Sequence, residues 1–140
     1  MEYLNLTIVT PEKTVYEAQV ERVTVPTDAG EITVLARHIP MITTIKSGAM
    51  RVIDESGKEE VFAVFGGVMD IMTDSRAVIM ADQTESVSEI DEARAQEAYE
   101  RAQQAMSEKG QEIDSDQYEM VQKQLQKHLN RINVAKKWRK

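Results

Sequence analysis

Cysteine is absent from this 140-residue chain, and glycine and proline are almost confined to its first 88 residues. Without cysteine there is no disulfide framework, thiol nucleophile or thiolate metal site. Of the six glycines and three prolines, only Gly110 lies after Ser88. Turn signals therefore punctuate the first part of the chain, whereas the second part has the composition of helices.

Long apolar runs are also missing. The longest nearly apolar run, residues 61–69, is about half of the length that spans a bilayer. The first residues lack the basic start and the apolar core of a signal peptide. We therefore expect a soluble protein with no direct membrane insertion, which reaches a membrane only through a partner.

Basic residues are scarce in the first part of the chain, and acidic residues are absent from its last twenty-one positions. Residues 1–88 hold 7 Lys and Arg against 14 Asp and Glu, which argues against a nucleic-acid partner for this part. No acid follows Glu119, whereas seven bases do: Lys123, Lys127, Arg131, Lys136, Lys137, Arg139 and Lys140. Bases toward the C-terminus of a helix complement its dipole, and contact with an acidic protein partner is the alternative interpretation.

Short apolar or alternating segments fill the first part and predict β-strands. They cover residues 4–10, 15–18, 20–25, 31–35, 41–45, 49–53, 61–65, 68–72 and 77–81. Turn residues separate them, and Pro26 is expected to end one of them. No helix-length pattern intervenes, so the segments predict an antiparallel sandwich or flattened barrel. Gly66-Gly67 predicts a bulge, a tight corner or a close backbone approach.

The second part predicts two antiparallel helices. Ser88 and Asp91 have the spacing of a capping box, and Gly110 is the expected C-cap of the first helix. The second helix is expected to start at Asp114 or Ser115. The expected contact residues are Ala93, Ala95, Ala98, Ala102, Ala105 and Met106 on the first helix, and Tyr118, Val121, Leu125, Leu129 and Ile132 on the second. Alanine buries a single methyl group, worth about 0.8 kcal/mol, so we expect a marginally stable, mobile arm.

Catalytic signals are lacking. The two histidines, His38 and His128, lie in different parts of the chain, and neither has an acid at ligand spacing, so no metal site is expected. The sequence contains no nucleophile elbow and no phosphate-binding glycine loop. The chain is therefore not expected to be an enzyme.

Several longer stretches, in order from about residue 4 to residue 135, resemble one family. They include Val9-Thr10-Pro11-Glu12, residues 20–26 and 30–40, Ile45-Lys46-Ser47-Gly48, residues 63–71 and residues 90–95. Together these stretches are similar to the epsilon subunit of bacterial F-type ATP synthase. The resemblance implies an α+β fold: an N-terminal antiparallel β-sandwich of about ten strands in residues 1–86, followed by a C-terminal antiparallel two-helix hairpin in residues 87–140.

The family's function is non-catalytic. The resemblance implies a rotor-stalk subunit that couples proton transport to ATP synthesis and inhibits ATP hydrolysis through its mobile hairpin. The implied partners are the gamma subunit, the ring of c subunits and, when the hairpin is raised, the alpha and beta subunits. The implied location is the cytoplasmic face of the bacterial cell membrane, as a peripheral protein.

The resemblance also implies which residues contact the c ring. Glu31 and His38 match the loop that faces the c ring, although their ordinary interpretation is a turn acid and a surface histidine. Ala36-Arg37 stands where the family has Pro-Gly, so a less tightly turned loop with an extra charge is expected.

The resemblance also implies ATP as a regulatory ligand, with no cofactor required. Glu85, Asp91, Arg94 and Arg131 match the positions at which some bacterial members bind it. Lys127 replaces an arginine of those members, which implies a lower affinity because lysine is a point charge rather than a fork. The alternative is that Asp91 only caps the helix and Arg94 is simply exposed.

The basic residues Lys123, Lys127 and Arg131 are the expected inhibitory contacts of the raised arm. Two other interpretations stay open. One is a stand-alone ATP-sensing module, and the other is an unrelated β-sandwich adaptor. A stable complex with gamma would distinguish the rotor-stalk subunit from the ATP-sensing module and from the adaptor.

Overall fold

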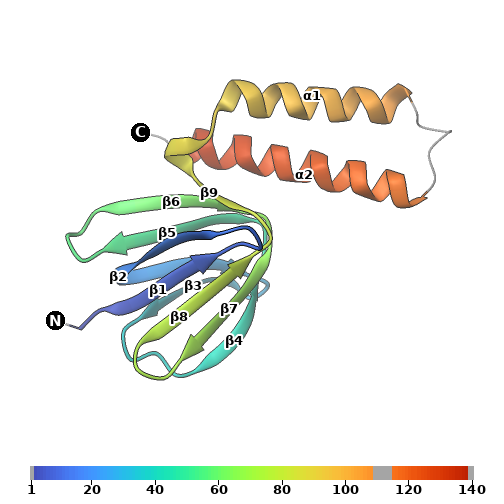
Figure 1. Ribbon diagram of the computed structural model, residues 1–140. Helices are drawn as coiled ribbons and strands as arrows, with labels where there is room; N and C mark the ends of the chain where they lie inside the picture. The colour runs from blue at the N-terminus through green and yellow to red at the C-terminus, as the bar shows by residue number, and fades with distance from the viewer. Residues whose placement is uncertain (1, 109–114, 139–140) are drawn as a thin grey trace.

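The computed structural model describes residues 2–108 and 115–138, and it places every strand before the two α-helices (Figure 1). The elements are β1 (Leu4–Val9), β2 (Thr14–Thr27), β3 (Gly30–Leu35), β4 (Met41–Ile45), β5 (Gly48–Asp54), β6 (Glu59–Val64), β7 (Gly67–Met72), β8 (Arg76–Ala81), β9 (Thr84–Ser86), the 3₁₀ turn η1 (Val87–Glu89), α1 (Glu92–Glu108) and α2 (Ser115–Trp138). The α+β class, a sandwich followed by a helical hairpin, is confirmed.

The strands run in the order β4-β7-β8-β1-β2-β5-β6-β9, with β3 paired to β2. The described residues form nine strands where the resemblance implied about ten, and the β1–β8 pair is parallel while the other pairs are antiparallel. β2 pairs with β1 through residues 14–20 and with β3 through residues 22–27. The first half of β2 therefore belongs to the layer that contains β1, and its second half to the layer that contains β3.

The expectation that Pro26 ends a strand was wrong, as was the division of residues 15–25 into two segments. Both lie inside the 14-residue strand β2. The pairing of β2 with β5 ends at Thr24, so the missing N–H of Pro26 removes no hydrogen bond from that ladder. The Pro26 carbonyl still accepts a hydrogen bond from the Lys46 N–H at 2.9 Å.

The turns follow the residue chemistry. Asp74 and Ser75, in the three-residue loop between Met72 and Arg76, have φ angles of 64° and 54°, and such positive φ values let the chain reverse tightly. Gly67 is a close-approach glycine, because a Cβ there would lie 2.6 Å from the Met80 carbonyl oxygen. The expectation of a close backbone approach at Gly66-Gly67 is therefore confirmed.

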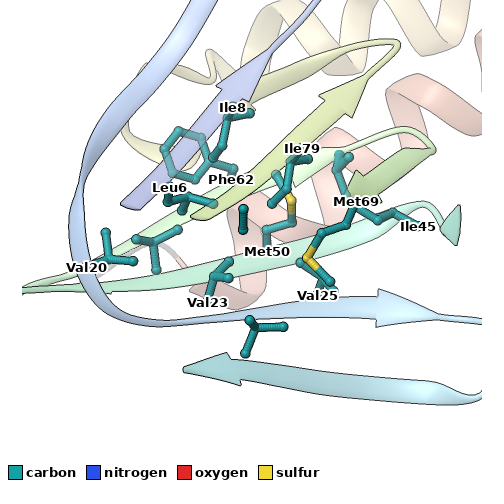
Figure 2. Close-up of a cluster of buried hydrophobic side chains, with 14 of the residues drawn as sticks. Leu6, Ile8, Val20, Val23, Val25, Ile45, Met50, Phe62, Met69 and Ile79 are labelled. Atoms are coloured by element: carbon teal, nitrogen blue, oxygen red, sulfur yellow. The ribbon is translucent and has the colours of Figure 1, made fainter. Parts of the chain in front are cut away.

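The main core lies between the two layers of the sandwich (Figure 2). Its fully buried large side chains include Phe62, Leu6, Ile8, Met50 and Met69. Tyr16 packs on its edge, with its ring 5.5 Å from that of Phe62 in an edge-to-face arrangement. Leu6, Ile8, Met50 and Met69 come from strands whose buried and less buried residues alternate, whereas β6, which supplies Phe62, is buried on both faces.

In the hairpin, α2 lies between α1 and the sandwich (Figure 1). The expected contact surface is only partly confirmed. Ala95 and Ile132 are buried, and Val121 and Leu125 are half-buried. Ala98, Ala102, Ala105 and Met106 are half-buried too, whereas Ala93, Tyr118 and Leu129 are exposed. The last apolar residues of α2, Val134 and Ala135, pack on the sheet. The expected cap Gly110 and the alternative start Asp114 lie outside the described residues.

Candidate functional site at the junction of arm and sandwich

The last turns of α2 hold the arm on the sandwich through a small second core. Its residues are Val61, Ala63, Val87, Ile90, Val134 and Ala135, with Ala49 and Trp138 against it. In α2, only Ile132, Val134 and Ala135 are buried. The remaining length of α2 is exposed or half-buried. The arm, formed by α1 and α2, is therefore attached to the sandwich at its root, the last turns of α2. The outer part of α2 packs against α1.

The start of α1 differs from the expected capping box. Ser88 lies in the 3₁₀ turn η1, where its hydroxyl contacts that of Ser86 at 2.9 Å. Asp91 is the actual cap, since its Oδ1 accepts a hydrogen bond from the Arg94 N–H at 3.1 Å. Ile90 is buried beside η1 and belongs to the second core, so η1 takes the place of the first turn that the capping box predicted.

Two polar contacts reinforce the root of the arm. Arg131 on α2 forms an ion pair with Glu85 on β9, and both side chains are more than half buried. The Asn130 amide donates to the Val64 carbonyl at 2.9 Å and to the Gly48 carbonyl at 3.4 Å. Both contacts join residues of α2 to the edge of the sheet, so they exist only while the arm is down.

A cleft of about 360 Å³ lies beside this root. Lys127, Asn130 and Arg131 line it from α2, and Glu85 and Asp82 line it from the sheet edge. Burial and the neighbouring Arg131 charge lower the pKa of Lys127, and Glu85 partly offsets this. The cleft thus carries charges of both signs, with the bases Lys127 and Arg131 on the α2 side and the carboxylates Asp82 and Glu85 on the side of the sheet.

The four predicted nucleotide-binding residues form two separate pairs. Glu85 and Arg131 lie together at the cleft. Asp91 and Arg94 lie at the start of α1 and do not line the cleft; their side chains are 3.8 Å apart and Arg94 is 85% exposed. Arg131 already engages Glu85, so an anionic ligand would have to share or displace that carboxylate. Binding of ATP stays a prediction.

The two predicted c-ring residues do not lie on one loop. Glu31 lies at the start of β3, and its carboxylate accepts a hydrogen bond from Arg51 at 3.1 Å. His38 follows the other end of β3, and its ring Nδ1 lies 2.7 Å from the Ile39 carbonyl. The length of the strand separates them, so one narrow surface does not present both, and their contact with a ring stays a prediction.

The expectation of a less tightly turned loop at Ala36-Arg37 was wrong. Arg37 takes a positive φ of 66°, the conformation that glycine would adopt there. Its backbone N–H donates to the Ser75 hydroxyl at 2.9 Å, and its guanidinium pairs with Glu2. The turn is therefore kept, and the extra charge is paired.

The three predicted inhibitory bases have different surroundings. Lys123 is exposed, Lys127 lines the cleft and Arg131 is paired with Glu85. Only Lys123 is fully open to a partner while the arm is down. A joint role of the three in inhibition stays a prediction.

Several residues at the junction have no counterpart in the predicted site. Trp138, the single tryptophan, lies beside Arg51, with the guanidinium carbon 5.2 Å from the ring centroid. His128 and Asn130 also face the junction. The helical period of α2 placed these residues near Arg131 in sequence, but only the docked geometry shows what they contact.

One outer face of the sandwich is apolar. In the register of β4, β7 and β8, Ile42 lies opposite Asp70, and Val68 lies opposite Met80. Ile42 is 71% exposed and Met80 is 45% exposed. Ile39, in the preceding loop, is 78% exposed. Asp70 lies among these side chains, so the face is mostly apolar with one acid, and exposed apolar side chains of this kind mark interaction surfaces.

Within residues 2–108 and 115–138, no three His, Asp or Glu side chains gather closely enough to hold a metal ion. In that same part of the chain, neither helix has the length and apolar character of a membrane span.

Two family models together match residues 3–136. Residues 3–87 match the β-sandwich domain of the ATP synthase delta/epsilon chain, and residues 88–136 match its long α-helix domain. This chain belongs to the ATP synthase delta/epsilon chain family. The resemblance to the epsilon subunit of ATP synthase that the sequence indicated is thereby confirmed.

Relatives in this family cover nearly the full length. An ATP synthase epsilon chain of Desulforamulus reducens is 41% identical over 93% of this chain and 95% of its own length. Another, of Bacillus pumilus, is 36% identical over 98% of this chain and 100% of its own length. The epsilon chain is a non-catalytic subunit of ATP synthase, so the expectation that this chain is not an enzyme is confirmed.

Solved structures share the fold. One is the mitochondrial ATP synthase of Euglena gracilis, which matches with a TM-score of 0.67 at 20% identity, over 97% of this chain and 79% of that chain. The central stalk and c ring of the Tetrahymena thermophila mitochondrial enzyme match with a TM-score of 0.55 at 16% identity, over 96% of this chain and 94% of that chain. The sandwich with its helical arm is therefore a fold that members of such assemblies also have.

Proposed function

We propose that this chain is a rotor-stalk subunit of an F-type ATP synthase, which couples proton transport to ATP synthesis and restrains ATP hydrolysis with its helical arm. The observation that carries the regulatory part is how the arm is attached. A few buried residues at the end of α2, one ion pair and one amide hold it on the sandwich. Such an attachment can open without disturbing the main core.

The apolar outer face supports gamma as the sandwich's partner. Ile42, Val68 and Met80 offer a surface that a second protein would cover, and His38 and Ile39 lie beside it at the end of β3. The proposed c-ring contact of His38 would then lie next to the gamma surface. Glu31 lies at the opposite end of β3 and is left to meet the c ring.

Release of the arm would free the basic side chains of α2 for the alpha and beta subunits. Arg131 is engaged by Glu85 while the arm is down, and it becomes available only when the arm rises. These contacts would place the protein at the cytoplasmic face of a bacterial membrane, bound peripherally through the complex.

A test replaces Lys123, Lys127 and Arg131 together by glutamine. ATP hydrolysis is measured in a complex of alpha, beta and gamma to which the full chain is added. We expect inhibition to weaken severalfold, because the raised arm loses three positive charges. A control variant with glutamine at Arg22, Lys46 and Arg76 of the sandwich, which line neither the cleft nor the surroundings of Trp138, has the same net charge and should inhibit normally.

Equal inhibition by the wild type and the α2 variant would contradict the proposed role of the arm. Equal loss in both variants would show an effect of net charge alone.

ATP sensing by the isolated chain is the second candidate function. The cleft supports it, because Lys127 and Arg131 face a hollow large enough for part of a nucleotide. Asp91 and Arg94 do not line this cleft, so they would contribute only through movement of α1 or of the ligand.

A further inference from the structure

His128 lies at the point where the arm meets the sandwich. It is half-buried on α2, and Arg131 donates from Nη1 to its Nδ1 at 3.2 Å. Arginine is always a donor, so Nδ1 must be the unprotonated nitrogen of a neutral imidazole. This hydrogen bond, made within α2 by the arginine that also reaches the sheet, therefore requires the neutral imidazole.

The same arginine connects the arm to the sheet. Through Nε it pairs with Glu85 on β9, while its Nη1 contacts His128. His128, Arg131 and Glu85 thus form a chain of contacts from α2 to β9. Arg131 and Glu85 are 46 residues apart in the sequence. Orientation of the guanidinium by His128 therefore bears directly on the contact that holds the arm down.

The charges around His128 favour its neutral form. Lys127 and Arg131 face it from α2 itself, Arg101 faces it from α1, and Glu85 faces it from β9. Three cations thus surround the ring, and the one carboxylate is already paired with Arg131. Burial, followed by the Lys127 and Arg131 charges, lowers the pKa of His128, and Glu85 offsets only part of this.

We infer that His128 makes the folded-down arm a pH-sensitive latch, which opens when its imidazole is protonated. Protonation converts Nδ1 from an acceptor into a donor, so the Arg131 hydrogen bond is lost. It also adds a fourth positive charge to the cluster. This inference rests on the proposed function, in which the raised arm restrains hydrolysis, and it adds acidity as the signal that raises it.

The direction follows from linkage. Burial is the largest cause of the lowered pKa of His128 in the docked arm, and release removes it, so the pKa rises toward the ordinary histidine value of about 6.5. The docked state thus binds fewer protons, and its stability is complete above about pH 6.5. It falls as the pH drops from there toward the lower pKa of the docked form. At pH 5.5 the ratio of docked to released arm falls by up to about tenfold.

The full chain contains its own reporter. Trp138 is the single tryptophan, and in the docked arm it lies against the second core and Arg51. Its fluorescence should shift to longer wavelength as the pH falls from 8 to 5.5, a range above the ordinary titration of carboxyl groups. His128→Ala should abolish the shift.

The matched control uses the only other histidine. His38 is exposed in the β3–β4 loop and belongs neither to the second core nor to the cleft, so His38→Ala should keep the wild-type titration. A shift that persists in His128→Ala, or that disappears in His38→Ala, would overturn the inference.

A second measurement separates the latch from the proposed function. ATP hydrolysis by the alpha, beta and gamma complex is measured at pH 6 and pH 8, each relative to the complex without this chain. Stronger inhibition at pH 6 with the wild type, and equal inhibition at both values with His128→Ala, supports the latch. Absence of inhibition at any pH contradicts the proposed function, while the Trp138 titration still decides whether His128 controls docking.

Discussion

Replacing Val134 by alanine tests whether the second core holds the arm down. Val134 is 6% exposed and lies among Val61, Ala63 and Ala135. The change removes two buried methyl groups, worth about 1.6 kcal/mol, and leaves a small cavity. Alanine is also the better helix former by up to about 0.6 kcal/mol, so α2 itself should not unfold.

The docked arm should therefore lose about 1.5 to 2 kcal/mol relative to the released arm, which is roughly a 10- to 30-fold change in their ratio. Trp138 fluorescence reports docking, and far-ultraviolet circular dichroism reports helix content. We expect a shift of Trp138 toward solvent without loss of helix. In the complex with alpha, beta and gamma, the more frequently released arm should inhibit hydrolysis more strongly.

The control is Val121→Ala, the same substitution on the same helix. Val121 is half-buried and lies outside the second core, at the other end of α2. It should leave Trp138 unchanged. Equal fluorescence shifts in the two variants, or none in Val134→Ala, would refute the argument that the arm is held at its root.

Three further predictions concern other parts of the chain. Ile42→Lys should weaken gamma binding at least tenfold in a pull-down or titration, whereas Met120→Lys, at a similarly exposed position on α2, should not; equal binding would exclude the apolar face as the gamma surface. Gly67→Ala should lower the free energy of unfolding in urea by about 1 to 3 kcal/mol, since its Cβ would meet backbone at 2.6 Å, and an unchanged midpoint would contradict this. Lys127→Arg should tighten Mg-ATP binding severalfold in calorimetry, because a guanidinium presents a fork to phosphate, and unchanged or weaker binding would argue against the cleft as the nucleotide site.

The sandwich could be predicted well because its signals are local. Alternation along strands such as β1, β5 and β7 determines which side chains enter the core, and turn residues such as Asp74 and Ser75 determine where the chain reverses. The sequence did not predict that β2 continues through Pro26. A proline is tolerated at that position because the pairing with β5 has already ended at Thr24, and the sequence does not show where a pairing ends. The three-residue strand β9 carries too few residues to show a period.

The junction could be predicted only in part. Glu85 and Arg131 were identified by resemblance, and the structure brings them together. The cap moved from Ser88 to Asp91 because η1 occupies the intervening residues. The helical period of α2 could not indicate that Val134 would pack on the sheet, because the sequence does not state which neighbour each face of a helix meets.

The central claim is that the arm, and not the sandwich, restrains hydrolysis. The most direct measurement compares ATP hydrolysis by the alpha, beta and gamma complex with the full chain and with a chain truncated after Ser88. The account predicts that both bind and that only the full chain inhibits. Equal inhibition by the truncated chain would contradict it, because the sandwich would then be sufficient without α1 and α2.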